Sequence, residues 1–292
     1  MGILGFDGHL NTGLTIRTVR IRDGIAEVRA GATLLWDSIP EEEEKETELK
    51  ASAFLEAVIG PQGGSSSSST SGSILSAEEI ESQRFASTCG VGKKIVLLDH
   101  EDSFVHTLAN YLRQTGAEVK TIRHNLLQTL LKEEGKPDLV VMSPGPGRPE
   151  DFECSKTLAI LEKEKIPTFG VCLGLQSMIE YFGGELGVLS YPMHGKPSEV
   201  KVIRVQGDHS FDGIPDAFTV ARYHSLYATR MPDVLSVTAT ALAKGDEGEE
   251  ICMAIRHKTL PFAAVQFHPE SILTRHLHGL RLLANAVAHL NY

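Results

Sequence analysis

Residues 166–182 decide the fold, and they read Ile-Pro-Thr-Phe-Gly-Val-Cys-Leu-Gly-Leu-Gln-Ser-Met-Ile-Glu-Tyr-Phe. Ile166 to Val171 is an apolar run of strand length, and Leu173 to Phe182 has the length and apolar spacing of a helix. Cys172 alone separates the two segments. A buried strand that passes directly into a helix is the repeating unit of parallel α/β sheets, so this stretch predicts such a sheet.

The same alternation continues on both sides of this stretch. The sequence predicts strands at Lys94–Asp99, Glu118–Ile122, Asp138–Met142 and Pro261–Val265, and helices at Ser103–Gln114, Ser155–Lys163 and Ile272–Leu290. Shorter strand-like runs dominate between Glu199 and Val265. Strands that alternate with helices of this length pair in parallel. We therefore expect an α/β fold, a three-layer sandwich with a mostly parallel central sheet.

Composition narrows the class of protein. The 292 residues carry 28 Lys and Arg against 38 Asp and Glu, a net charge of −10, which argues against nucleic acid as the main partner. No apolar stretch approaches the roughly 18 residues of a membrane span, and Met1–Gln62 has no signal-peptide pattern. Four cysteines are too few for a disulfide framework in a chain of this length. We expect a cytoplasmic enzyme without a membrane partner.

The chain divides by composition into three parts. Residues 1–59 hold half of the excess negative charge. Residues 61–73 consist almost entirely of Gly and Ser, which gives the backbone freedom and offers no apolar surface to bury. Ser76 to Cys89 then has a helix-start signal. We predict a fragment at 1–59, a Gly/Ser-rich linker at 60–92 and the main domain at 93–292.

The sequence Gly170-Val171-Cys172-Leu173-Gly174 lies where the strand meets the helix. It has the G-x-nucleophile-x-G pattern, in which flanking glycines prevent collisions at a sharp turn. A thiol at a helix N-terminus is favoured as thiolate, and the Leu173 N–H would point at an oxyanion. The alternative is a buried structural cysteine between packing glycines.

A second motif, Gln266-Phe267-His268-Pro269-Glu270, follows the last predicted strand. In an extended chain, positions i and i+2 face the same side, so Glu270 can hold one ring nitrogen of His268. The other nitrogen is then left for Cys172. A lone histidine is usually a surface or core residue, but a His-x-Glu pair that ends a buried strand favours catalysis.

A third motif is the loop Ser143-Pro144-Gly145-Pro146-Gly147, directly after the strand that ends at Met142. Two prolines stiffen the loop, and two glycines leave its amides open to a ligand. The alternative is a rigid turn without a partner. Ligand sites of α/β sheets form at the carboxyl ends of parallel strands, which is where this loop lies.

Together these motifs resemble the class I (triad) glutamine amidotransferases over about 95–275, and more narrowly the glutaminase component of anthranilate synthase. The segments that carry the resemblance are Asp102–Phe104, Ser143–Gly147, Gly170–Gln176, Met193–Lys196, Tyr223–Leu226 and Phe267–Ser271. The resemblance implies hydrolysis of L-glutamine through a thioester on Cys172, without a cofactor. His268 would act as base and acid, and Glu270 would orient it.

The resemblance also assigns the binding groups. The amides of Gly145 and Leu173 would form the oxyanion hole, and Gln176, Ser225 and Leu226 would hold glutamine. Leu175 departs from the family, which usually has His there, and this affects the expected glutamine affinity more than the chemistry. Glu153 and Cys154 replace the small residues that are common after the Pro-Gly loop.

Residues 1–59 read as a hairpin and one helix. Leu14–Ile21 and Ile25–Leu35 alternate like paired strands around the turn Asp23-Gly24, and Ile39–Val58 reads as an acidic helix. These elements are too few to make a stable core alone. We expect them to be the end of a larger domain.

This front segment resembles the last part of the chorismate-converting synthase subunit, an α+β domain. The resemblance implies that Arg17 and the Gly31 amide hold the carboxylate of chorismate and that Lys50 faces the substrate. Glu43 and Glu46, one helical turn apart, would ligate Mg²⁺ in the complete synthase domain. The alternative for this acidic run is a solvated helix face, and we expect the metal remnant to be unoccupied in this fragment.

The order of the parts resembles a fused anthranilate synthase shortened to its tail. The leading hypothesis is a glutaminase that supplies ammonia to a chorismate-aminating synthase partner for anthranilate, in tryptophan biosynthesis. The same chemistry for aminodeoxychorismate (folate) or for a phenazine precursor is a close rival. A third hypothesis is a docking or regulatory module that is inactive without its partner. We do not expect the fragment to convert chorismate by itself.

Overall fold

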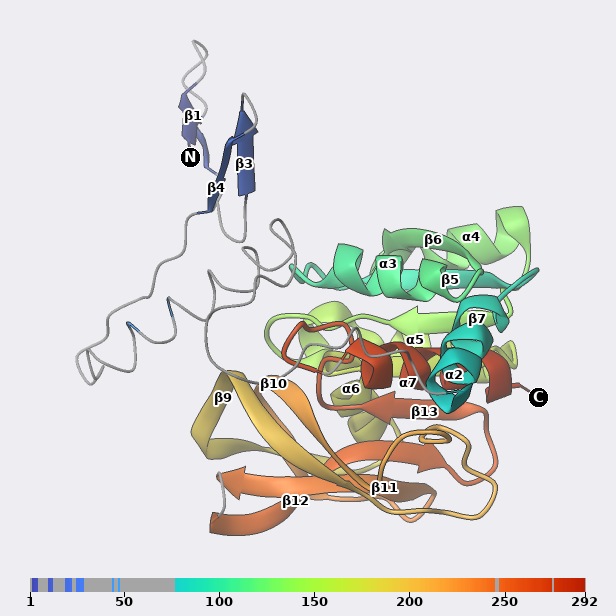
Figure 1. Cartoon of the computed structure of the whole chain (residues 1–292). Helices are drawn as coiled ribbons and strands as arrows, with labels where there is room; N and C mark the ends of the chain where they lie inside the picture. The colour runs from blue at the N-terminus through green and yellow to red at the C-terminus, as the bar shows by residue number, and fades with distance from the viewer. Residues whose placement is uncertain are drawn as a thin grey trace. The chain divides into compact units, whose positions relative to one another are not determined.

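The structure is a computed structural model of two compact units, Met1–Ser73 and Ile74–Tyr292 (Figure 1). It describes residues 2–4, 10–12, 19–22, 25–28, 44, 47 and 77–291, except 245, 246 and 275. The boundary between the units falls inside the linker predicted at 60–92. Each unit is described by itself below.

The first unit contains two short antiparallel pairs. Strand β1 (Gly2–Leu4) pairs with β2 (Leu10–Thr12), and β3 (Val19–Arg22) pairs with β4 (Ile25–Val28). The second pair confirms the central part of the predicted hairpin, since Arg22 and Ile25 are opposite each other. Glu44 and Thr47 are helical, within the predicted acidic helix. The rest of both predictions lies outside the described residues.

The second unit is built on a nine-stranded sheet with the order β10-β9-β11-β12-β13-β8-β7-β5-β6. Its parallel half comprises β5 (Lys94–Asp99), β6 (Glu118–Arg123), β7 (Leu139–Met142), β8 (Thr168–Val171) and β13 (Phe262–Val265). Its antiparallel half comprises β9 (Glu185–Val202), β10 (Ala217–Arg230), β11 (Leu235–Lys244) and β12 (Glu247–His257). The predicted α/β fold is confirmed, with a mixed sheet.

Helices cover both faces of the parallel half, and their order along the chain can be followed in Figure 1. They are α2 (Ala77–Thr88), α3 (Val105–Gln114), α4 (Leu127–Glu134), α5 (Cys154–Lys163), α6 (Leu173–Tyr181) and α7 (His276–His289), with 3₁₀ turns at His124–Leu126 and Pro149–Phe152. Successive side chains of a strand point to opposite faces of the sheet, so the core is divided into two clusters. Leu97 packs in the cluster with α3 and α7, whereas its neighbour Leu98 packs in the cluster with α5 and α6.

The helix α2 packs against α7. The Arg281 guanidinium lies 4.2 Å from the centre of the Phe85 ring, and its Nη1 donates to Ser82 Oγ at 3.3 Å. Cys89 Sγ donates to the carbonyl of Ala284 at 3.5 Å. The predicted helix after the Gly/Ser run is therefore confirmed, and it belongs to the second compact unit.

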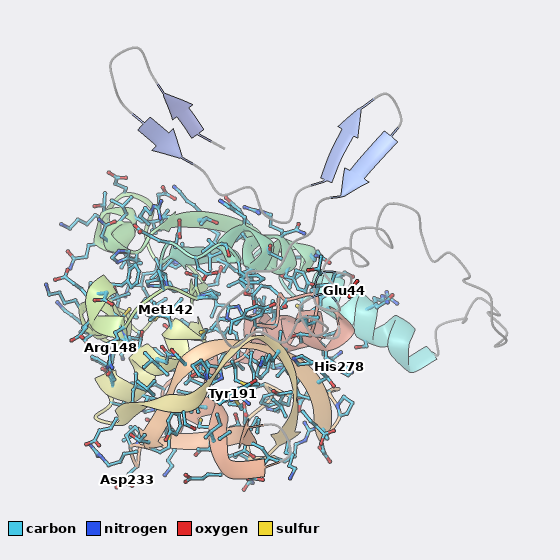
Figure 2. All side chains as sticks on the ribbon, turned by 90° about the vertical axis from the view of Figure 1, so that its left-hand side faces the viewer. Glu44, Met142, Arg148, Tyr191, Asp233 and His278 are labelled. Atoms are coloured by element: carbon cyan, nitrogen blue, oxygen red, sulfur yellow. The ribbon has the colours of Figure 1, made fainter. Side chains whose placement is uncertain are left out.

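Figure 2 shows the side chains of the second unit from another side. Met142, at the carboxyl end of β7, is completely buried, whereas Asp233, before β11, is exposed. The loops that carry the predicted site motifs begin at the buried carboxyl ends of the parallel strands. Within the described residues, no helix combines the length and apolar character needed to cross a membrane.

Candidate active site

Cys172 occupies the turn between β8 and α6, with φ 53° and ψ −95°. A non-glycine residue in this region stores about 1–3 kcal/mol of strain, which functional sites commonly hold. A Cβ on Gly170 would lie 2.7 Å from the carbonyl carbon of Gly174, and a Cβ on Gly174 would lie 3.0 Å from the Met142 carbonyl oxygen. Gly170 therefore requires glycine, and Gly174 leaves only a tight contact for a larger residue, in line with the motif.

His268 and Glu270 lie just beyond the end of β13, and both are buried. His268 Nδ1 donates to Glu270 Oε1 at 2.9 Å, as the i, i+2 spacing predicts. His268 Nε2 is buried and has no hydrogen-bond partner within the described part of the chain. The second ring nitrogen is thus left for a reacting group.

Electrostatics favour the protonated form of this imidazole. Burial lowers the pKa of His268, but the negative charge of Glu270 and the Cys172 thiol together raise it well above 6.5. The influence of the thiol places Cys172 beside the ring. A cysteine next to a protonated imidazole is the arrangement that favours a nucleophilic thiolate.

Gln266 joins Cys172 to the glutamine-binding residue expected on α6. Its Nε2 donates to Cys172 Sγ at 3.5 Å, and its Oε1 accepts from Gln176 Nε2 at 3.4 Å. Gln266 is not among the site residues predicted from the sequence. The signal was present, because the period of two that aligns His268 with Glu270 also aligns Gln266 with them.

The ring of His268 packs against two aromatic rings, which also contact each other. Its centroid lies 5.1 Å from that of Phe104 and 4.9 Å from that of Tyr223. Both rings belong to motifs that carry the family resemblance, although neither was assigned to the site. Tyr111 of α3 is also near, since burial and the charge of Glu270 raise its pKa.

The backbone of His268 is anchored to β10. Its N–H donates to the Ala221 carbonyl at 3.1 Å, and its own carbonyl accepts from Thr274 Oγ1 at 2.7 Å. The same Thr274 oxygen accepts from the Ala221 N–H at 3.0 Å. The sequence gives no signal for this clamp, because the partners lie 53 residues apart.

The Pro-Gly loop after β7 lies against the cysteine turn. A Cβ on Gly145 would lie 2.5 Å from Leu173 Cδ2 and 2.9 Å from His100 Cβ. Ser143 Oγ, at the start of the loop, accepts from the His100 N–H at 3.0 Å. The two residues expected to form the oxyanion hole, Gly145 and Leu173, are therefore adjacent; the role of their amides stays a prediction.

The residues expected to hold glutamine lie on two elements. Gln176 is buried on α6, one turn after Cys172, and its N–H donates to the Cys172 carbonyl at 3.1 Å. Ser225 is half-buried and Leu226 is buried on β10, directly after Tyr223. Leu175, which departs from the family, is fully buried in the core cluster with α5.

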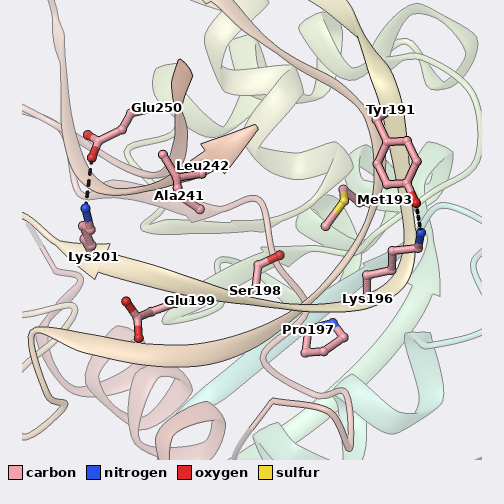
Figure 3. Close-up of a pocket in the computed structure, with 10 residues that line it drawn as sticks. All are labelled: Tyr191, Met193, Lys196, Pro197, Ser198, Glu199, Lys201, Ala241, Leu242 and Glu250. Carbon is pink, nitrogen blue, oxygen red and sulfur yellow. Dashed lines mark hydrogen bonds and ion pairs between the residues drawn. The ribbon is translucent and has the colours of Figure 1, made fainter. Parts of the chain in front are cut away.

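The residues predicted for the chorismate-site remnant lie outside the described residues. They are Arg17, Gly31, Glu43, Glu46 and Lys50. Their roles, and the fit of Glu43 and Glu46 to Mg²⁺, stay predictions. In the second unit, a cavity of about 390 Å³ lies between β9, β11 and β12 (Figure 3), and no residue of the Cys-His-Glu set lines it.

The family model of class I glutamine amidotransferases matches residues 96–290, and the model of chorismate binding enzymes matches residues 1–56. The chain therefore belongs to the class I glutamine amidotransferase family. A Thermoplasma acidophilum protein described as part of a GMP synthase has the same fold, with a TM-score of 0.59 and 23% identity over 68% of this chain and 94% of its own.

Two curated relatives narrow the kind of amidotransferase. Anthranilate synthase from Azospirillum brasilense is 49% identical over 98% of this chain, which spans 36% of that relative's length. Anthranilate synthase component 2 from Methanocaldococcus jannaschii is 39% identical over 67% of this chain and 96% of its own length. The chain is thus similar to the glutaminase component, joined to the end of a chorismate-binding segment.

Proposed function

We propose that this chain hydrolyses L-glutamine to glutamate and ammonia and that the ammonia serves a chorismate-aminating synthase that makes anthranilate. The observation that carries the proposal is the buried His268–Glu270 pair beside Cys172 at a strained strand-to-helix turn. The matched family and relatives support the same reaction. Ammonia made for anthranilate feeds tryptophan biosynthesis.

The reaction divides into two halves. The Cys172 thiolate attacks the side-chain amide carbon of glutamine, and the amides of Gly145 and Leu173 stabilise the oxyanion. Protonated His268 gives its Nε2 proton to the leaving nitrogen, so ammonia departs and a glutamyl thioester remains. Neutral His268 then takes a proton from water, which attacks the thioester and releases glutamate and the Cys172 thiolate. Glu270 holds the imidazole in one tautomer throughout.

Substrate recognition falls to groups around this centre. We infer that Gln176, Ser225 and Leu226 hold glutamine, Gln176 from α6 and the other two from β10. Gln266 contacts both the Cys172 sulfur and Gln176, so it connects the nucleophile with the binding residues. This link fixes the sulfur relative to the bound substrate.

We propose a division into a synthase fragment at 1–59, a linker at 60–92 whose end forms α2, and the amidotransferase domain at 93–292. In the complete synthase domain, Arg17, Gly31 and Lys50 would bind chorismate, and Glu43 and Glu46 would hold Mg²⁺. The metal would supply positive charge beside the substrate carboxylate. The partner is the synthase domain or subunit that carries the rest of that site.

The test is glutamate release from L-glutamine by the chain and by Cys172→Ala, with a free chorismate-converting synthase subunit and chorismate present. We expect release that falls at least about 10³-fold in the variant, with anthranilate as the aromatic product. Aminodeoxychorismate or a phenazine precursor as the product would favour the rival pathways. Equal release by both proteins would contradict the thiol mechanism.

A further inference from the structure

The ladder between β10 and β9 is interrupted at the segment expected to bind glutamine. In the register with β9, His224 is opposite Met193 and Leu226 is opposite Val188, whereas Ser225 has no partner. Ladder irregularities such as bulges free a residue from pairing and are frequent beside active sites. The backbone at Ser225 is therefore not committed to the β9 ladder.

His224 contacts Arg222 before this interruption and Leu226 after it. Its ring is 3% exposed, its Nδ1 lies 2.8 Å from the Leu226 carbonyl oxygen, and its Nε2 lies 3.1 Å from Arg222 Nε. A guanidinium only donates, so His224 Nε2 must accept from it. The ring proton is then on Nδ1 and is donated to the Leu226 carbonyl. Arg222 thus fixes the tautomer that holds Leu226 in place.

Arg222 is a buried cation whose hydrogen-bond partners in the described part of the chain are neutral. It is completely buried, and no ion pair of the described residues includes it. Its Nη1 donates to the Leu242 carbonyl at 2.8 Å and to Ser198 Oγ at 3.5 Å, which are both neutral. Burial lowers its pKa to about 10, which leaves it charged at neutral pH. A buried unpaired charge costs stability, so this arrangement is better explained by a role in the site.

The two acceptors of Arg222 Nη1 also tie it to other strands of the sheet. Ser198 belongs to β9 and Leu242 to β11, and both line the cavity drawn in Figure 3. The Arg222 guanidinium therefore binds two other strands, β9 and β11, as well as His224. The contacts thus run from β9 and β11 through Arg222 and His224 to the Leu226 carbonyl.

We propose that Arg222 and His224 are positioning residues that hold the Ser225–Leu226 segment of β10 in the conformation that binds glutamine. This inference rests on the proposed glutaminase function. It predicts that the contact to the Leu226 carbonyl matters more for glutamine binding than the contact to Arg222 alone. Neither residue takes part in bond making, so the reactivity of Cys172 itself stays unchanged.

The experiment measures alkylation of Cys172 by iodoacetamide in the full chain and the glutamine concentration that halves its rate. His224→Asn places an amide near the position of Nδ1 and keeps a donor for the Leu226 carbonyl. His224→Gln places its amide near the position of Nε2 and keeps only the Arg222 contact. Arg222→Met removes the charge, and His257→Gln is a matched control at a buried histidine that accepts two backbone N–H groups elsewhere in the sheet.

We expect His224→Gln to raise the glutamine concentration that halves the alkylation rate roughly fivefold to tenfold, and Arg222→Met to raise it by a smaller factor. In His224→Asn and His257→Gln, the glutamine concentration that halves the alkylation rate stays within about twofold of its value in the unsubstituted chain. The alkylation rate without glutamine is unchanged in all four variants. Equal protection of Cys172 by glutamine in His224→Asn and His224→Gln would overturn the proposal. These two variants test the proposal even if Arg222→Met fails to fold. Absence of protection in the unsubstituted chain would contradict the proposed function itself.

Discussion

At the scale of single residues, His268 is held by three kinds of contact. Its Nδ1 donates to Glu270, its ring packs against Phe104 and Tyr223, and its backbone is bound to Ala221 and Thr274. A ring held in this way needs little reorganisation when it transfers a proton.

Glu270→Gln tests the orienting role. Loss of the negative charge lowers the pKa of His268, and the new amide can donate to Nδ1 and stabilise the wrong tautomer. We expect glutamate release to fall about 10²–10⁴-fold while the chain stays folded. Steady-state kinetics with thermal unfolding as a control measures this, and activity within tenfold of the unsubstituted chain would contradict the role.

The buried His100 side chain leads us to predict a loss of folding stability at acidic pH. Burial, with the charge of His124, lowers its pKa from 6.5 to about 4. Below pH 6.5 the unfolded chain therefore binds a proton that the folded chain does not, so stability is lost as the pH falls from 6.5 to about 4. We expect this group to contribute about 3 kcal/mol over that window.

Denaturant unfolding at several pH values measures the effect, with His100→Asn as the comparison. Asparagine does not titrate and keeps a polar atom near Ser143 Oγ, which His100 Nδ1 contacts at 3.1 Å. The difference in unfolding free energy between the two proteins should shrink as the pH falls. Parallel pH profiles would show that His100 is not the titrating group.

The residue scale also shows what sequence can and cannot predict about this site. The nucleophile and the His-Glu pair follow from local spacing, because a turn and an extended strand fix the directions of neighbouring side chains. The clamp by Thr274 and the contact of Gln266 with Cys172 depend on segments brought together only by folding. The catalytic and binding roles of these residues stay predictions until variants are measured.

At the scale of elements, the turn between β8 and α6 depends on close backbone approach. Gly170→Ala would place a methyl group 2.7 Å from the carbonyl carbon of Gly174, which is backbone and cannot move aside easily. We expect a loss of about 3 kcal/mol or more in unfolding free energy. Gly92→Ala is the control, since its Cβ would meet nothing within 4 Å and costs only the strain of φ +81°, about 1 kcal/mol. Equal losses, measured by denaturant unfolding, would contradict the steric argument.

The parallel half of the sheet was predictable and the antiparallel half was less so. Buried apolar runs identify β5, β7, β8 and β13, whereas the helix α4 was not predicted. The region read as short runs forms strands of 10 to 18 residues. Gly195 and Pro192 lie within β9 and read as breaks in sequence, but both are skipped where the register between β9 and β10 shifts.

At the scale of the whole molecule, α2 fastens the end of the predicted linker to the second unit. In a shortened chain that begins at Ile74, we expect the second unit to unfold with the same free energy as in the full chain. A chain that begins at Lys93 loses the packing of Phe85 and the burial of Ala86, for which we expect a cost of about 2–4 kcal/mol. Equal unfolding midpoints for the two shortened chains would contradict this role of α2.

The front segment leads to a prediction about chorismate. The chain spans 36% of the Azospirillum relative, and only residues 1–56 match the chorismate-binding family. We expect no anthranilate from the purified chain with chorismate and an ammonium salt, because most groups of a chorismate site lie outside such a segment. Fluorescence detects anthranilate directly, and its formation would contradict this expectation.

The central claim is that Cys172 is the nucleophile of a glutaminase, and covalent trapping tests it most directly. The other three cysteines are poor nucleophiles, since burial raises the pKa of Cys89, of Cys154 to about 11 and of Cys252 to about 12. We expect a chloroketone analogue of glutamine to add once per chain, at Cys172, as mass spectrometry of the intact and digested protein would show. Excess L-glutamine should block the reaction. Addition at another cysteine, or no protection by L-glutamine, would contradict the account.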